Sequence, residues 1–292
     1  MKKVLFPFEI DRRCYREAYV YAVAMARNLS AELILLNAFY VEADNDITKN
    51  RYNLLLRNNW LRAYREIHDF HGYYLNNYAR SNPEFRLKTD HRFIHGNLVD
   101  EFRIAVHREK IDFVVLPATD VNESARRKIK LMRREALNCS LTSLLITPHE
   151  ITYKPIKNFL FAYSLKEQGE LFENLDVMIQ NTSLSDSTIH LVHLSKHGIS
   201  ALEPDHEPFR SVLEAIQKRN QVVFHGFQEK HREKEITDYI AEHDIQLLAF
   251  TKSQFHAIGN YFRRHIIEEL CSVSKIPVLI LKETDHDAMY YT

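Results

Sequence analysis

Residues 31–39 read AELILLNAF, a near-continuous apolar run. A strand without polar alternation is usually covered on both faces, and a parallel sheet is covered by helices in this way. The residues before this run carry apolar side chains at Ala18, Ala22, Met25, Ala26 and Leu29. Spacings of three and four place these side chains on one stripe of a helix. The stretch therefore predicts an α/β fold built on a parallel sheet.

The pattern continues outward from this stretch through the first half of the chain. Strands are predicted in VLFPFE (4–9), in FRLKTDHRFIHGN (85–97), in IDFVVLPAT (111–119) and in LTSLLIT (141–147). A long helical segment is predicted around Leu56 to Tyr78, and shorter helices are predicted over 98–110 and 126–138. Strands that alternate with helices predict βαβ units in a doubly wound sheet.

The second half of the chain repeats this order once. Five segments match in sequence: 4–9 with FLFAYS (159–164), 31–39 with STIHLVHLS (187–195), RFIHGN (92–97) with VVFHGF (222–227), 111–119 with IQLLAFTKS (245–253), and 141–147 with IPVLILK (276–282). Five matches in one order indicate two copies of a domain. The intervening TPHEITYKP contains two prolines and is typical of a linker. We therefore predict two tandem α/β domains, 1–148 and 156–283.

Each predicted domain has a five-stranded parallel sheet with helices on both faces. We expect the two domains to pair within the chain, because pairing covers an exposed edge strand in each copy. We also expect each domain to keep its own sheet. One continuous ten-stranded sheet would contradict that expectation.

Composition excludes several classes of protein. The 292 residues are 45% hydrophobic, 27% charged and 11% aromatic, which is typical of a packed globular protein and not of a disordered or fibrous one. The formal net charge is zero, so no global field favours nucleic acid or an acidic membrane as a partner. We expect a protein without a membrane span. Three cysteines at no metal-ligand spacing favour a reducing, cytoplasmic compartment.

The repeat resembles the universal stress protein family in its tandem two-domain form. VLFPFE is similar to the first strand of that family, and LLITP and IPVLILK are similar to its closing strand. The His-Gly pairs at 95–96 and 225–226 lie where the family has a glycine after its third strand. The resemblance implies a five-stranded parallel sheet per domain, and pairing of the domains through their fifth strands.

Many members of that family bind ATP through a glycine motif, and this chain departs from it. The motif is a Gly, a second Gly three positions on, and a Gly-Ser or Gly-Thr ten positions later that opens the last helix. The corresponding residues are Thr251, Gln254 and Arg264-His265 in the second copy, and about Pro117, Asp120 and Ile129-Lys130 in the first. Side chains at the glycine positions would fill the space that phosphates need. We therefore predict degenerate ATP-binding motifs and no cofactor.

A residual ligand site is predicted at the carboxyl ends of the first and fourth strands of the first copy, where the strand order of such a sheet reverses. That rim combines an acid for a ribose hydroxyl with cations for a small anionic ligand. The candidate residues are Glu9, Asn37, Pro117, Thr119, Arg126, Arg127 and Lys130. In the second copy, Ser164 replaces the acid and bulky aromatic residues follow the fourth strand. We therefore expect any anion to bind the first copy.

The basic run from Arg126 to Arg134 has two interpretations. It carries six cations and no acid, so its side chains could bind phosphate in place of glycine amides. The favoured alternative is a solvated helix face with Ile129 and Met132 pointing inward. A nucleic-acid or membrane-surface adaptor acting through this run is the least favoured interpretation.

No nucleophile motif, Walker motif or dinucleotide motif is present, so we predict no enzyme activity. Sixteen histidines are scattered without a spacing that dictates a metal site.

The resemblance implies a cytosolic stress-response protein that acts by binding or scaffolding. The alternative is a protein that binds ATP or AMP, or hydrolyses it slowly, in a degenerate pocket. Association of two chains into a homodimer is left open.

Overall fold

The structure is a computed structural model of the chain. It describes residues 1–8, 13–41, 48–81, 86–118, 122–149, 151–163, 187–195, 216–228, 232–252 and 275–282, together with the isolated residues 175, 179 and 214. The first half contains the strands β1 (Lys3–Pro7), β2 (Glu32–Phe39), β3 (Thr89–His95), β4 (Phe113–Pro117) and β5 (Ser143–Thr147). Its helices are α1 (Arg13–Asn28), α2 (Lys49–Ser81), α3 (Leu98–Arg108) and α4 (Glu123–Asn138).

The second half contributes five more strands. These are β6 (Asn158–Tyr163), β7 (Thr188–Ser195), β8 (Val222–Gln228), β9 (Leu247–Thr251) and β10 (Val278–Leu281), with the helix α7 (Arg232–Glu242). Within each half all neighbouring strands are parallel. The α/β class and the parallel pairing predicted from the apolar runs are confirmed.

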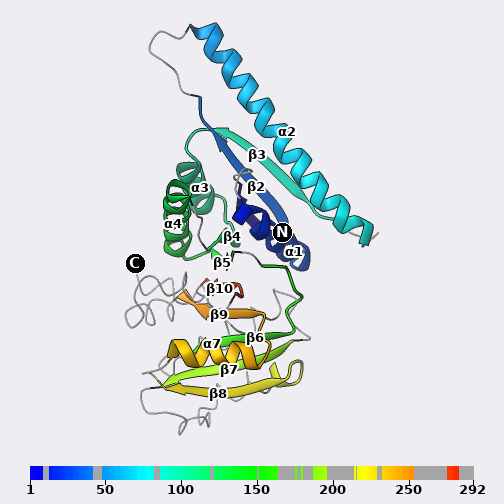
Figure 1. Ribbon diagram of the computed structural model, residues 1–292, viewed down its shortest axis with the longest axis vertical. Coiled ribbons are helices and arrows are strands. Elements are labelled where there is room, and N and C mark those ends of the chain that lie inside the picture. Colours follow the sequence, from blue (N-terminus) through cyan, green and yellow to red (C-terminus); the bar gives the residue numbers. More distant parts are fainter. Residues whose placement is uncertain are drawn as a thin grey trace.

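All ten strands form one sheet, in the order β3-β2-β1-β4-β5-β10-β9-β6-β7-β8 (Figure 1). The halves join where β5 and β10 pair antiparallel, with Leu279 opposite Leu145. Our expectation of two separate sheets is therefore wrong. The halves share one sheet because two exposed edge strands are covered most completely when they hydrogen-bond to each other. The domain limits 1–148 and 156–283 stay a prediction.

Helices cover both faces of the sheet, as predicted. On β1, Val4 and Phe6 pack with α1 on one face, and Leu5 packs on the opposite face with α3 and α4. The helix α7 of the second half lies on the same face as α3 and α4. Both hydrophobic clusters contain residues from both halves, so the core is continuous across the β5–β10 seam.

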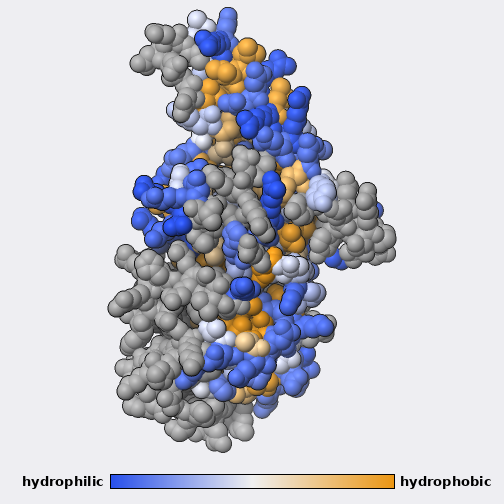
Figure 2. Space-filling view, in the orientation of Figure 1, coloured by the Kyte–Doolittle hydropathy of each residue, from blue (hydrophilic) through white to orange (hydrophobic). Residues whose placement is uncertain are grey.

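The helix α2 lies along the outer strands at one end of the molecule (Figure 1). Ile67 and His71 of this helix are buried, whereas Trp60 and Tyr64 are only partly covered. Leu54 and Leu55 are exposed, and hydrophobic residues reach the surface near this end of the molecule in Figure 2. No helix in the described ranges is both long enough and apolar enough to cross a membrane.

Candidate functional site

The predicted rim lies at the carboxyl ends of β1, β2 and β4, and Asn37 lies near the end of β2. Asn37 is nearly buried, and its Nδ2 donates to the carbonyl oxygen of Phe8 at 2.8 Å. The Phe8 amide in turn donates to the Leu36 carbonyl at 2.8 Å. Asn37 therefore fastens the chain leaving β1 to β2, and its amide group is already used.

The connection from β4 to α4 is short. Pro117 is the last residue of β4, and α4 begins at Glu123, so only residues 118–122 join the two elements. In the family motif the Gly-Ser or Gly-Thr pair opens the last helix, but the corresponding residues here, Ile129-Lys130, lie in the second turn of α4, which begins three residues before the predicted start at Arg126. The family motif needs at least ten residues between its strand and its helix. A connection of half that length cannot wrap around a triphosphate.

The first turn of α4 carries its own cap. Asn122 precedes the helix with extended backbone angles, and its Oδ1 accepts from the Ala125 amide at 3.2 Å. The amides at a helix start are the donors that would otherwise bind a phosphate. One of them is occupied by a side chain here. Pro117, at the preceding strand end, has no amide hydrogen to offer.

The predicted cations lie on the outward face of α4. Arg126, Arg127 and Lys130 are exposed, and Arg127 pairs with Glu123 at 2.7 Å one helical turn away. Ile129 and Met132 are buried, which confirms the interpretation of this run as an amphipathic helix with a solvated basic face. Exposed pairs of this kind contribute little to stability, and these side chains can be recruited by an anion at small cost.

One cation of the run departs from this arrangement, and the sequence analysis missed it. Arg133 is buried, and its Nη2 donates to the carbonyl oxygen of Ala118, directly after β4. Its position was predictable from spacing, because Arg133 follows Ile129 by four residues and precedes Ala136 by three. It therefore lies on the apolar face, where a long side chain must find an acceptor.

The corresponding strand end of the second half carries a buried lysine. Thr251 ends β9, and the next residue, Lys252, is buried. Its Nζ donates to the carbonyl oxygens of Ala136, at 3.0 Å, and of Cys139, at the end of α4. The ammonium group thereby caps the negative end of a helix dipole from the other half of the chain. The residue that follows β9 therefore stabilises the fold.

Several predicted positions lie outside the described residues. These are Glu9 and Thr119 of the first rim, Asp120, and Ser164, Gln254, Arg264 and His265 of the second half. Among the described candidates, the structure brings Asn37 and Pro117 to one edge of the sheet, and places Arg126, Arg127 and Lys130 on the exposed side of α4. The rim remains a candidate site, and its acid, Glu9, lies outside the described residues.

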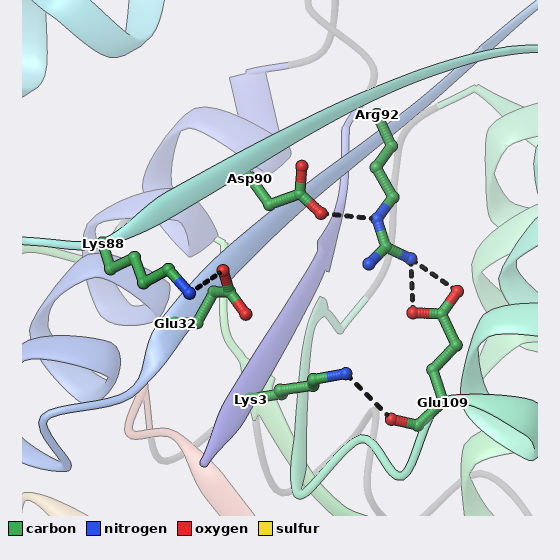
Figure 3. A network of polar contacts seen from close by, with 6 residues as sticks. All are labelled: Lys3, Glu32, Lys88, Asp90, Arg92 and Glu109. Atoms are coloured by element: carbon green, nitrogen blue, oxygen red, sulfur yellow. Dashed lines mark hydrogen bonds and ion pairs between the residues drawn. The ribbon is translucent and has the colours of Figure 1, made fainter. Parts of the chain in front are cut away.

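Hydrogen bonds and ion pairs link polar side chains on β3 and its neighbours (Figure 3). Arg92 donates from Nη1 to both carboxylate oxygens of Glu109 at 2.5 Å and from Nε to Asp90 at 2.8 Å. Burial would lower the pKa of Arg92, but the bonds to Glu109 and Asp90 outweigh it and raise the pKa. Lys3 bonds the Glu109 carbonyl oxygen at 3.2 Å, and Lys88 pairs with Glu32 at 2.9 Å. This network ties strand starts to the end of α3.

An open pocket of about 450 Å³ lies near the linker between the halves. Its floor is apolar, with Ile240, Ile245 and Ile276, and Lys154 and Lys275 are among its lining residues. Gln246 also lines it, but its Oε1 already accepts from the amides of residues 157 and 158 at 2.9 and 2.7 Å. None of the predicted rim residues lines this pocket.

Comparison with solved structures identifies the fold. A universal stress protein from Archaeoglobus fulgidus DSM 4304 superposes with a TM-score of 0.58 over 97% of both chains, at 15% identity. The chain has the fold of the universal stress proteins. The cytoplasmic domain of a prokaryotic cation chloride cotransporter has a TM-score of 0.54 at 12% identity, covering 96% of this chain and 94% of that one.

A third structural neighbour is a functionally unknown protein from Pseudomonas aeruginosa PAO1. It has a TM-score of 0.52 at 15% identity, over 99% of this chain and 95% of that chain. Neither a protein-family model nor a curated protein matches the sequence. The resemblance inferred from the repeat is thus supported at the level of the fold.

Proposed function

We propose that this protein acts in a stress response by binding or scaffolding, and that it neither binds ATP in the usual way of its fold nor catalyses a reaction. The observation that carries the proposal is the five-residue connection between β4 and α4. A phosphate-binding loop works because consecutive backbone amides approach the phosphates closely, which needs length and glycines. The described part of this connection offers neither.

The fold neighbours are compatible with a binding role. One of them is a universal stress protein, and another is the cytoplasmic domain of a cation chloride cotransporter. The same fold therefore also occurs as one domain of a larger protein. A module of this kind works through the surfaces and ligands that it binds. We also propose that the chain is located in the cytoplasm.

A small anion, if it is the ligand, should bind the first half at the rim near α4. Arg126 and Lys130 are exposed on α4, and Arg127 forms a solvent-exposed pair with Glu123. The double charge reversal Arg126→Glu and Arg127→Glu should weaken binding of such an anion at least tenfold. Binding that survives this double change would place the ligand elsewhere, and Lys130→Glu provides the third test position on the same face.

The direct test is the nucleotide content of the purified protein. The protein is denatured, and the released small molecules are measured by absorbance and mass spectrometry. The proposal predicts less than one nucleotide per ten chains. A stoichiometric content of ATP or AMP would contradict it and would favour the alternative, a nucleotide-binding protein with a degenerate pocket.

A further inference from the structure

Histidines in the sheet are confined to its two ends. His91 and His95 lie on β3, His190 and His193 lie on β7, and His225 lies on β8. The seven neighbouring strands between them, from β2 through the β5–β10 seam to β6, contain no histidine. The two outer ends of one sheet therefore differ from its centre in the only side chain that ordinarily titrates between pH 5 and 8.

The first histidine cluster joins α1, α2 and β3. His71 of α2 is buried, and its Nδ1 is hydrogen-bonded to the hydroxyl of Tyr19 in α1, which is also buried. The His91 ring of β3 stands edge-on to the His71 ring at 4.7 Å between ring centres. His68 lies one turn before His71 and lowers the pKa of both His71 and His91.

This cluster is poorly suited to hold a protonated histidine. A protonated imidazole carries two N–H donors and needs two acceptors. The Nε2 atoms of His71 and His91 are both buried and have no hydrogen-bond partner among the described residues. Burial and the neighbouring histidines lower the pKa of His71 to about 4. The carboxylate that raises the pKa of His91 is that of Asp90, which is already bonded to Arg92 at 2.8 Å.

The second cluster has a similar chemistry at the opposite end of the sheet. His190 of β7 is buried, and its Nδ1 is hydrogen-bonded to the Tyr239 hydroxyl of α7 at 2.8 Å. The His243 ring lies 4.0 Å from the Tyr239 ring and 5.4 Å from the His190 ring, and His225 of β8 lies 4.7 Å from Tyr239.

Protonation is opposed in the second cluster as well. Burial, and then the proximity of His243, lower the pKa of His190 to about 4. Burial and His243 also lower the pKa of His225, against the opposite effect of Glu235 and Glu242 on α7. In both halves a tyrosine-bonded histidine thus joins a helix to the outer strands, with further histidines beside it.

The described residues hold no group of three or more potential metal ligands at these sites. We propose instead that the two clusters form an acid-sensitive switch, in which protons taken up by His71 and His190 release α2 and α7 from the sheet ends and expose the faces of the outer strands that these helices cover. The central strands have no histidine and keep their pairing. Apolar strand faces that lose their covering helix are surfaces on which another apolar surface can pack, which couples acid to binding. This inference does not depend on the proposed function.

The sign of the effect follows from proton linkage. A histidine whose pKa is lower in the closed state than its value of about 6.5 in the open state takes up a proton on opening. Opening is therefore disfavoured fully above pH 6.5 and becomes about tenfold more frequent per pH unit as the pH falls toward 4. Between pH 7.5 and 5.0 this corresponds to roughly a 30-fold rise in opening for each buried histidine.

Hydrogen exchange of the full chain measures this opening locally. Protection factors, which correct for the intrinsic effect of pH on exchange, are compared at pH 7.5 and 5.0 by mass spectrometry. We expect protection to fall roughly 30-fold in peptides from α2 and β3 and from α7 and β8, and to stay within about threefold in β5 and β10. Equal loss in β5 and β10, or no loss at either end, would overturn the proposal.

Variants separate the two clusters. The double variant His71→Gln and His91→Phe should abolish the acid response at α2 and β3, and should leave the response at α7 and β8 intact. His190→Gln should do the reverse, and it carries the test alone if the double variant fails to fold. His107→Gln on α3 is the matched control, because His107 is exposed and lies in neither cluster. An unchanged response in both cluster variants would refute the assignment.

Discussion

At the scale of single residues, Asn37 shows how a side chain predicted for a ligand serves the backbone. Its amide holds the Phe8 carbonyl at 2.8 Å in a buried position. Asn37→Ala should lower the free energy of unfolding by about 1–3 kcal/mol, because a buried carbonyl is left without a partner. Urea denaturation measures the change. Asn59→Ala is the control, since that amide bonds the Tyr40 carbonyl at 3.5 Å in an exposed place, and it should cost under about 0.5 kcal/mol.

Lys252 also serves the backbone, and it does so across the two halves of the chain. Its ammonium group binds the carbonyl oxygens of Ala136 and Cys139 at the end of α4. Lys252→Ala should reduce stability by about 2 kcal/mol, because the helix end loses its cap in a buried place. Lys130→Ala, on the exposed face of the same helix, should change stability by less than about 0.5 kcal/mol. Equal effects of the two substitutions in thermal denaturation would contradict this role for Lys252.

At the scale of elements, the start of α4 decides what the β4–α4 connection can bind. Asn122 occupies the Ala125 amide through its Oδ1. Asn122→Ala should destabilise the protein by about 1 kcal/mol, whereas Asn122→Ser should stay close to the original value, because serine is also a good cap. Chemical denaturation of the three proteins tests this. A serine variant as unstable as the alanine variant would show that the cap is not the cause.

At the scale of the whole molecule, the continuous sheet predicts cooperative unfolding. Leu145 and Leu279 are buried opposite each other at the seam, and both hydrophobic clusters run through both halves. Neither half can unfold without exposing an edge strand and apolar surface of the other. Calorimetry at pH 7.5 should therefore show one transition whose van't Hoff and calorimetric enthalpies agree. Two resolved transitions would indicate independent domains.

The stability of the whole molecule should also depend on pH. His71 and His190 each have a pKa lowered to about 4 in the folded protein, against about 6.5 in the unfolded chain. The unfolded chain then binds more protons, so stability is full above pH 6.5 and is lost as the pH falls toward 4. Between pH 7.5 and 5.0 the loss should be about 2 kcal/mol per histidine. Replacement of both histidines by glutamine should flatten this dependence in thermal melts.

The sequence predicted the strands well because long apolar runs have few alternatives, and the helix α2 because its periodicity is sustained. The family resemblance implied pairing of the domains through their fifth strands, but the residues alone could not show that β5 and β10 join the two sheets into one, since an edge strand and a central strand carry the same apolar pattern. The helix predicted over 126–138 is present as α4, whereas the correspondence of Ile129-Lys130 with the family's Gly-Ser pair does not hold, because the chain lacks the long loop of that motif. The spacing places Arg133 on the apolar face of α4 but does not identify its acceptor, and the acceptors of Lys252 lie more than a hundred residues away, so no local pattern indicates its buried role.

The central claim is that the universal stress fold works here without ordinary nucleotide binding. Titration calorimetry of the full chain with Mg²⁺ and ATP at pH 7.5, and with AMP in a parallel titration, tests it most directly. The five-residue connection after β4 and the capped start of α4 predict no saturable heat below millimolar nucleotide. Saturable binding of one ATP per chain with a micromolar Kd would contradict the account.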